Sequence, residues 1–579
     1  MVDINLNGNY GSGNEVVELN DESCLKKNAR NRLLVCNGIT FSLIKMHVRY
    51  FDMQLMNTTN QNRKQLIFCI VTTFFWGMLA HGYCFMNSSF SHDSLNEFNG
   101  TIMGTGLKIM TGRFLSPIYR AIFRTELTIP WLIGLLALLW LGLSVFLIVC
   151  IFKIQSKTVM FLIAGVFVSN MTVSATAATF LHDFDCDMLS LLFSIAAVYA
   201  WRELSQGSLI GSVCVTMSLG LYQSYITVTI VLIMFACILD ILDENSFGFV
   251  FLNGIKAVGM LLVGGILYYI AMKATLHFHG IYLLTGQYNT LDKPMEMLTW
   301  SPWRFKLMIE ETYRMWYSRF TNVISPYPAI SSGISRLLLV IMVIILGIGI
   351  LNRKIHPSAK MLCIILIVLL PLAMNLMYFL TVGNSHWLMV FAFWLTYLLA
   401  LLLGERLSKF IQYRVSYFFK KESNKLSQIS RFICPALVLV LIYGNVQTAN
   451  AMYLKKDLEQ DAYLSVMTRV VYRMEDYDTY VPGLTPVIIV GLPEQMSEVI
   501  PGFEPYREPT GMYMSDVINH SERERWQAYF SYLLMNPITL ADDAVWNDLR
   551  QSPQVQKMPA YPMEGCITMI DGTLVVKLG

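Results

Sequence analysis

Long apolar stretches alternate with short polar segments between about residue 66 and residue 448. A helix needs about 20 apolar residues to cross a hydrocarbon core roughly 30 Å thick. About eleven stretches meet or approach this length, at 66–86, 131–152, 158–181, 188–201, 208–221, 227–242, 257–275, 337–351, 361–381, 387–404 and 432–448. The fourth to sixth are short, and the pair around SLGLYQSYITVTI could instead be re-entrant. The pattern predicts a polytopic α-helical membrane protein of about eleven spans.

The pattern changes after the last apolar stretch. DAYLSVMTRVVYRME has helical periodicity, TPVIIVGLP has the pattern of a buried strand, and CITMIDGTLVVKL is typical of a hairpin that turns at Asp571-Gly572. We therefore expect a small α/β domain at the C-terminus. The expected division of the chain is a polar N-terminal region at 1–64, a membrane domain at 65–448 with outer loops 87–130, 182–187 and 276–336, and a C-terminal domain at 449–579.

Lysine and arginine in the short connections predict how the chain crosses the membrane, because basic loops stay in the cytoplasm. Basic residues occur in the connections 153–157, 202, 256, 353–360 and 406–431. None occurs in the alternate connections 182–187, 222–226 and 382–386. The first 60 or so residues are polar and basic, without the apolar region of a cleavable signal peptide. We expect a cytoplasmic N-terminus and, after an odd number of spans, a C-terminal domain outside.

Composition narrows the class of protein further. Of 579 residues, 55% are hydrophobic and 14% charged, whereas soluble domains carry about 25% charged residues. The net charge of +3 and the lack of a basic stripe with interleaved aromatics argue against nucleic-acid binding. The 11 cysteines are scattered without CxxC or metal-type spacing, so we infer neither a structural zinc nor a disulfide scaffold.

One polar stretch, SHDSLNEFNGTIMGTGLKIMTGRF, follows the first apolar run and is expected outside, near the membrane surface. Asp93 there could act as a general base that deprotonates an acceptor hydroxyl. Alternatively, Asp93 caps the next helix and Glu97 lies in its first turn. The next run, TGRFLSPIYRAIFR, is amphipathic and basic, so we expect Arg113, Arg120 and Arg124 to face lipid phosphates at the membrane surface.

A second polar group, LHDFDCDML, brings Asp183, Asp185 and Asp187 to the edge of the membrane. Carboxylates at this depth are costly and are therefore candidates for function. They could hold a divalent cation, cap a span or bind sugar hydroxyls, or they could form a solvated loop without a role. Asp187 lies deepest in the span.

Two further outer segments contain uncharged polar residues. GLYQSY presents Tyr222 and Gln223, which suit sugar hydroxyls through stacking and amide hydrogen bonds, although they could equally link packed helices. VGNSHW presents Asn384 and His386, which could touch substrate or could be structural.

The segments expected on the cytoplasmic side contain neither a P-loop nor a dinucleotide-binding motif. Since nucleotide sugars are not available outside, a transferase with this layout would need a polyprenyl-phosphate donor whose lipid phosphate is the leaving group.

In these motifs the chain resembles the GtrII-like O-antigen glucosyltransferases of bacteria and bacteriophage. The resemblance rests on Asp93 followed by Gly112-Arg113, on DMLSLLFSIAAVY, on GLYQSY and on the terminal YPMEGCITMIDGTLVVKLG. It implies a GT-C-like membrane glycosyltransferase of the bacterial inner membrane. Asp93 would be the base, with Glu97 as the fallback, and Arg113 would stabilise the departing phosphate. The donor would be undecaprenyl-phosphate glucose and the acceptor the lipid-linked O-antigen in the periplasm.

The resemblance also implies a role in serotype conversion, and it implies a flippase and a donor synthase as partner proteins. It implies no cofactor, and a divalent cation at the acidic turn is not supported.

Two other functions remain open. A transporter or flippase for a lipid-linked sugar would place charges within spans and often show repeated halves, whereas these spans are nearly free of charge. A non-catalytic protein that assembles with other proteins of the cell envelope is the other alternative. In that case the substitution Asp93→Asn would leave the phenotype of the cell unchanged.

Overall fold

The computed structural model describes residues 61–87, 89–91, 95, 103–284, 299–351, 354–418, 423–493, 502–503, 513–514 and 523–579. The chain divides into two units, Met1–Gln65 and Leu66–Gly579, and the candidate site described below belongs to the second. The predicted base Asp93 and its fallback Glu97 lie outside the described residues.

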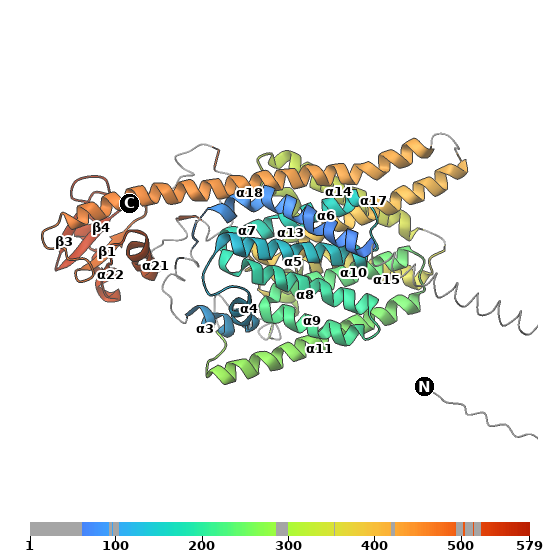
Figure 1. The fold of residues 1–579 in the computed structure, drawn as a ribbon, viewed down its shortest axis with the longest axis horizontal. Coiled ribbons are helices and arrows are strands. Elements are labelled where there is room, and N and C mark those ends of the chain that lie inside the picture. Colours follow the sequence, from blue (N-terminus) through green and yellow to red (C-terminus); the bar gives the residue numbers. More distant parts are fainter. Residues whose placement is uncertain are drawn as a thin grey trace, which may run out of the picture. The chain divides into compact units, whose positions relative to one another are not determined.

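Each apolar stretch expected from the sequence is mainly helical (Figure 1), but 158–181 is divided between two helices at Asn170 and 361–381 at Asn375. The helices are Gln61–Met86, α5 (Pro130–Ile151), α6 (Lys157–Ser169), α7 (Met171–Thr179), α8 (Phe184–Glu203), α9 (Gly207–Leu221), α10 (Ile226–Leu242), α11 (Phe247–His279), α14 (Pro328–Ile350), α15 (Pro357–Met374), α17 (Phe391–Phe418) and α18 (Ser423–Glu475). Shorter helices join them: α3 (Met103–Met110), α4 (Leu115–Phe123), α13 (Pro302–Thr321) and α16 (Leu376–Leu380).

Within the described ranges, nine helical segments are long and apolar enough to cross a membrane. The helix α9 is shorter, at 15 residues, and the described side chains of α17 end at residue 406. The outer helices carry apolar side chains on exposed faces. In α11, a row of Val258, Leu262, Ile266 and Ile270 is between 56% and 63% exposed, and such a row is stable only against lipid or another apolar surface. The chain is a polytopic helical membrane protein.

Small and hydroxyl-bearing residues set the spacing of the central helices. Ser194 of α8 lies 2.7 Å from Ser218 of α9 between their hydroxyl oxygens, and Ser190 bonds to the same hydroxyl at 3.1 Å. Gly264 of α11 packs so closely on α9 that a Cβ there would lie 2.6 Å from Val215 Cγ1. Close packing with interhelical hydrogen bonds is how helices associate in lipid, where apolar burial gives no advantage.

The last span and the first C-terminal helix form one helix. The sequence predicts a span ending near residue 448 and a separate helix at 461–475, but α18 runs without interruption from Ser423 to Glu475. A helix of 53 residues is roughly 80 Å long at 1.5 Å per residue. It carries the chain from the apolar region to the C-terminal sheet (Figure 1).

A four-stranded sheet follows α18, in the order β2-β1-β4-β3. Its strands are β1 (Pro486–Val490), β2 (Thr539–Leu540), β3 (Ile567–Ile570) and β4 (Thr573–Lys577). The strand β1 is parallel to β2 and β4, and β3 pairs antiparallel with β4. The hairpin turns at Asp571 and Gly572, with φ of 49° and 76°, as a type I′ turn requires. The expected strand and hairpin are therefore present, and a separate domain at 449–579 stays a prediction.

Candidate functional site

The acidic turn LHDFDCDML is buried. His182 and Asp183 belong to a short 3-10 turn, η1 (Leu181–Asp183), and Asp185 and Asp187 lie in the first turn of α8. These four side chains belong to residues that are at most 4% exposed. A solvated loop without a role, one of the alternatives open from the sequence, does not fit this burial.

Three cations surround the Asp183 carboxylate. Lys108 of α3 donates a hydrogen bond to it. The guanidinium groups of Arg113 and Arg120 lie 3.6 Å and 3.4 Å from its oxygens. A buried carboxylate is stable when partners of opposite charge replace its lost hydration. Asp183 therefore ties the α3–α4 segment to the start of α8.

Asp185 forms a second ion pair with Arg124, which follows α4. Two guanidinium nitrogens of Arg124 lie 2.8 Å and 3.2 Å from the two carboxylate oxygens, and both side chains are fully buried. Burial by itself disfavours the charged guanidinium, but the adjacent Asp185 carboxylate outweighs it, so the pKa of Arg124 is raised. Arg124 also donates to the backbone carbonyl of His182.

These contacts correct one sequence expectation. Arg113, Arg120 and Arg124 were expected to face lipid phosphates, but each lies against a buried aspartate, and the side chains of Arg120 and Arg124 are fully buried. Arg120 contacts the His182 ring and lies 2.8 Å from Glu126. Arg120 of α4 and Arg124, which follows it, therefore point toward the buried acids of the η1–α8 turn.

Asp187 differs from the other two aspartates. It is four residues after Asp183 and therefore on the same side of the turn. It is 2% exposed, yet among the described residues no hydrogen bond or ion pair to its carboxylate is found. Because a buried carboxylate without a partner is costly, Asp187 is the aspartate of this turn that remains able to receive a ligand.

The GLYQSY segment packs against the same place. It forms a 3-10 turn, η2 (Gln223–Tyr225), between α9 and α10. The Arg113 guanidinium lies 4.3 Å from the centre of the Tyr222 ring, a cation–π contact. Gln223 donates to the Thr111 carbonyl at 2.9 Å and to the Tyr268 hydroxyl at 3.1 Å. The side-chain nitrogen of Gln223 thus links packed helices, which is one of the two roles considered for this residue from the sequence.

The structure brings together six of the residues singled out from the sequence, which we call the acid–arginine cluster: Arg113, Asp183, Asp185, Asp187, Tyr222 and Gln223. His386 lies elsewhere in the chain, exposed, just before the 3-10 turn η3 (Trp387–Met389). In the described parts of the chain, no group of three or more His, Cys, Asp or Glu side chains is arranged to hold a metal ion. The oxygens of Asp183 and Asp185 are instead directed to lysine and arginine.

A comparison with known protein families shows which family this chain belongs to. A profile of the glucosyl transferase GtrII family matches residues 82–403, more than half of the chain. The chain belongs to the GtrII glucosyl transferase family. Neither the curated proteins nor the solved structures include a significant match.

The GtrII match contains the whole acid–arginine cluster and also the segment with Asp93 and Glu97. It ends within α17, before α18 and the C-terminal sheet. The terminal motif YPMEGCITMIDGTLVVKLG, on which part of the sequence resemblance rested, therefore lies outside the matched range.

Sequence reasoning missed several residues of this candidate site. Lys108, Glu126 and Tyr268 were not singled out, and the pairing of Arg124 with Asp185 was not foreseen. Tyr268 gives the clearest signal in retrospect, because it is a buried hydroxyl within an apolar span, and a hydroxyl in a span needs a polar partner. No pattern in the sequence marks Lys108.

Proposed function

We propose that this GtrII family member transfers glucose from a polyprenyl-phosphate donor to lipid-linked O-antigen on the periplasmic face of the bacterial inner membrane. Family membership supports glucosyl transfer. The lipid-linked donor follows from the expected outer location of the polar residues, where nucleotide sugars are absent. The basic residues in alternate connections support the orientation. A flippase and a donor synthase would supply the donor.

The observation that carries this proposal is the free carboxylate of Asp187 inside the acid–arginine cluster. A buried carboxylate with no structural partner suits a sugar, whose hydroxyls donate hydrogen bonds. The Tyr222 ring and the Arg113 guanidinium adjoin this position. We assign Asp187, Tyr222 and Arg113 to substrate binding, and Asp183 and Asp185 to holding the arginines in place.

The proposed reaction is a single displacement. The acceptor hydroxyl loses its proton to a carboxylate as its oxygen forms a bond to the anomeric carbon of the donor sugar. The bond between that carbon and the phosphate oxygen breaks, and the lipid phosphate leaves with the electron pair. Asp93 is the proposed base and Glu97 the fallback, while Gln223 and His386 are proposed to contact substrate.

The test is mass spectrometry of the O-antigen repeat from a bacterium with smooth lipopolysaccharide that supplies the polyprenyl-phosphate sugar. We compare the wild type with Asp187→Asn, Asp93→Asn and Glu97→Gln at equal membrane abundance. Asp548→Asn is the matched control, since Asp548 is an exposed aspartate in the C-terminal helix α22 (Asp543–Gln551).

We expect a hexose-mass increment with the wild type and the control. Asp187→Asn should reduce it at least tenfold because a bond to the sugar is lost, and Asp93→Asn should abolish it because the base is lost. An increment that survives Asp93→Asn but not Glu97→Gln would move the base to Glu97. No increment with the wild type, despite confirmed donor and acceptor, would refute the proposed function.

A further inference from the structure

The loop that follows the first span is held by the C-terminal region, residues 449–579. Phe90 and Leu95 are described residues of this loop, and the proposed base Asp93 lies between them in the sequence. Leu95 is fully buried in a hydrophobic core. Among the described residues, every other buried member of that core comes from Tyr463 or later in the chain. The outer loop therefore contributes a side chain to the core of the C-terminal region.

Phe90 makes a second contact with the same region. The centre of its ring lies 6.1 Å from that of Tyr529, in the short π-helical turn η4 (Tyr529–Leu533). Its side chain also packs against the core that contains Leu95. Aromatic rings at this separation attract one another. Phe90 and Leu95 thus attach the loop to the C-terminal region on both sides of residue 93 in the sequence.

Gln460 of α18 binds the backbone of the loop at Phe90. Its side-chain oxygen accepts a hydrogen bond from the Phe90 N–H at 3.2 Å, and its side-chain nitrogen donates to the Phe90 carbonyl at 2.5 Å. One amide side chain thus satisfies both backbone groups of one residue, as a neighbouring strand would. Because Gln460 is only 9% exposed, water competes little for these bonds.

The end of the first span is bonded to the same part of α18. Tyr83 donates to the Asp457 carboxylate at 2.7 Å. Nδ1 of His81 lies 2.8 Å from the Tyr453 hydroxyl. Tyr453, Asp457 and Gln460 follow one another at intervals of four and three residues, so they share one face of α18. This face contacts the chain from the end of the first span to the loop that follows it.

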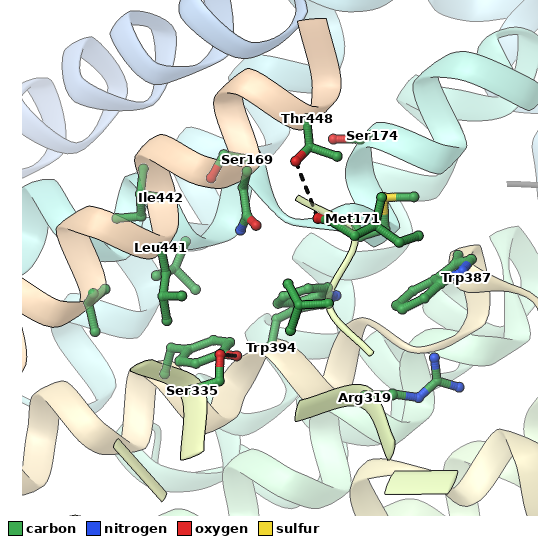
Figure 2. A pocket seen from close by; sticks show the side chains of 16 residues that line it. Ser169, Met171, Ser174, Arg319, Ser335, Trp387, Trp394, Leu441, Ile442 and Thr448 are labelled. Carbon is green, nitrogen blue, oxygen red and sulfur yellow. Dashed lines mark hydrogen bonds between the residues drawn. The ribbon is translucent and has the colours of Figure 1, made fainter. Parts of the chain in front are cut away.

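The helix α18 also contacts the helix that leads to the acid–arginine cluster. Lys456, four residues before Gln460, donates to the Ala178 carbonyl of α7 at 2.7 Å. Nearer the start of α18, Thr448 lines a small cavity together with Ser174 of α7 (Figure 2). From α7 the chain continues through η1 into the cluster. One stretch of α18 therefore holds both the loop of the proposed base and the helix before the acidic turn.

We propose that Gln460 is a positioning residue for the proposed reaction, and that the C-terminal region keeps the loop of the base in place relative to the acid–arginine cluster. Gln460 acts through the backbone of Phe90 and does not itself contact the substrate. The proposal rests on the proposed function, because the base that it positions is Asp93 or its fallback Glu97. The GtrII match ends at residue 403, so family membership assigns no role to Gln460.

The reason for such a device is geometric. A general base must lie within hydrogen-bond reach of the hydroxyl that it deprotonates. A misplacement of about 1 Å can lower the rate about 100-fold, and a loop without fixed points samples many conformations. Gln460, Phe90 and Leu95 supply fixed points. Loss of one of them should therefore slow the chemical step more than it weakens binding of the donor.

The test combines two measurements on the purified full-length protein in nanodiscs. Hydrogen exchange of a peptide that spans Phe90 to Leu95, followed by mass spectrometry, reports whether the loop is held and does not depend on activity. Initial rates of glucose transfer from a polyprenyl-phosphate glucose to lipid-linked O-antigen give kcat and KM.

The variants separate the loop contacts from general effects on the C-terminal region. Gln460→Met keeps the length of the side chain and removes both hydrogen bonds, while Leu95→Ala removes the anchor on the loop itself and leaves α18 intact. The control is Gln556→Met in α23 (Pro553–Lys557). Gln556 is exposed, and it also donates to a backbone carbonyl, that of Arg550, at 2.9 Å.

We expect Gln460→Met to speed exchange in the loop peptide and to lower kcat about tenfold or more, with the KM for the donor changed by less than about twofold. Leu95→Ala should act in the same direction, and Gln556→Met should match the wild type. Unchanged exchange in both loop variants would overturn the proposal. So would faster exchange with unchanged kcat, or a rise in KM as large as the fall in kcat, because Gln460 would then have a general structural role.

Failure of the proposed function gives a different result. Wild-type protein that transfers no glucose, with donor and acceptor confirmed, would refute the proposed function whatever the variants do. Wild-type transfer together with full activity of Gln460→Met and Leu95→Ala would refute only the positioning role.

Discussion

The charged side chains near the start of α8 differ in whether they form ion pairs within the protein. Asp183 and Asp185 form ion pairs with lysine and arginine, while among the described residues Asp187 forms no ion pair within 4 Å. Paired residues maintain the structure, and unpaired buried ones are candidates for ligands. This distinction cannot be made from sequence, in which the three aspartates of DFDCD look alike.

The Arg124–Asp185 pair gives a prediction at this scale. Removing one partner leaves a buried charge alone, so Arg124→Gln should destabilise the protein by about 3–5 kcal/mol. Replacing both, as in Arg124→Leu with Asp185→Leu, should restore much of that stability. The measurement is the midpoint of thermal aggregation in detergent.

The exposed pair of Lys306 and Glu310, with side chains 60% and 51% exposed, is the control for this experiment. Lys306→Gln should change stability by less than about 1 kcal/mol. If Arg124→Gln were as mild as Lys306→Gln, the buried ion pair would not be a structural element of the site.

Among the elements, the contact between α9 and α11 depends on a glycine. A Cβ at Gly264 would lie 2.6 Å from Val215 Cγ1 and 2.9 Å from the Ser212 carbonyl oxygen, and Thr216 donates to the Gly264 carbonyl at 3.0 Å. Gly264→Ala should therefore push the helices apart and cost about 1–3 kcal/mol.

The adjacent Gly265 provides the matched control, since a Cβ there would meet nothing within 4 Å. Gly265→Ala should leave the thermal midpoint unchanged or raise it slightly, because alanine favours helix. Equal loss of stability in both variants would show that helix propensity or another general effect, and not the contact with α9, explains the result.

The sequence predicted the elements better than their contacts. The apolar stretches located the helices because length and hydropathy are local properties. The Asp571-Gly572 turn located the hairpin for the same reason. The inward direction of Arg120 and Arg124 was missed because their partners are about 60 residues away in sequence, and an amphipathic basic helix has the same pattern beside lipid or beside buried acids. The continuity of α18 was missed because the rise in polarity after residue 448 was interpreted as a boundary.

For the whole molecule, the main prediction concerns its orientation in the membrane. The distribution of lysine and arginine predicts a cytoplasmic N-terminus and a C-terminal sheet on the outside. In a cysteine-free version of the chain, Asp571→Cys in the exposed hairpin turn should react with a membrane-impermeant maleimide added to spheroplasts.

A cysteine at Glu244, in the connection between α10 and α11, should react only after the membrane is permeabilised. Asp571 lies between β3 and β4 and Glu244 between α10 and α11, and both are exposed turn residues, so their intrinsic accessibility should be similar. Labelling of Glu244→Cys in intact spheroplasts would reverse the orientation and with it the proposed periplasmic reaction.

The single helix α18 has a mechanical consequence. Beyond Pro435, no proline interrupts it before Glu475, so it has no obvious hinge between the spans and the sheet. Its residues Leu441, Ile442 and Asn445 line a small cavity together with Trp394 of α17, and its C-terminal end leads to β1. A displacement of the C-terminal sheet would therefore be transmitted along this straight helix to the side chains that pack among the spans.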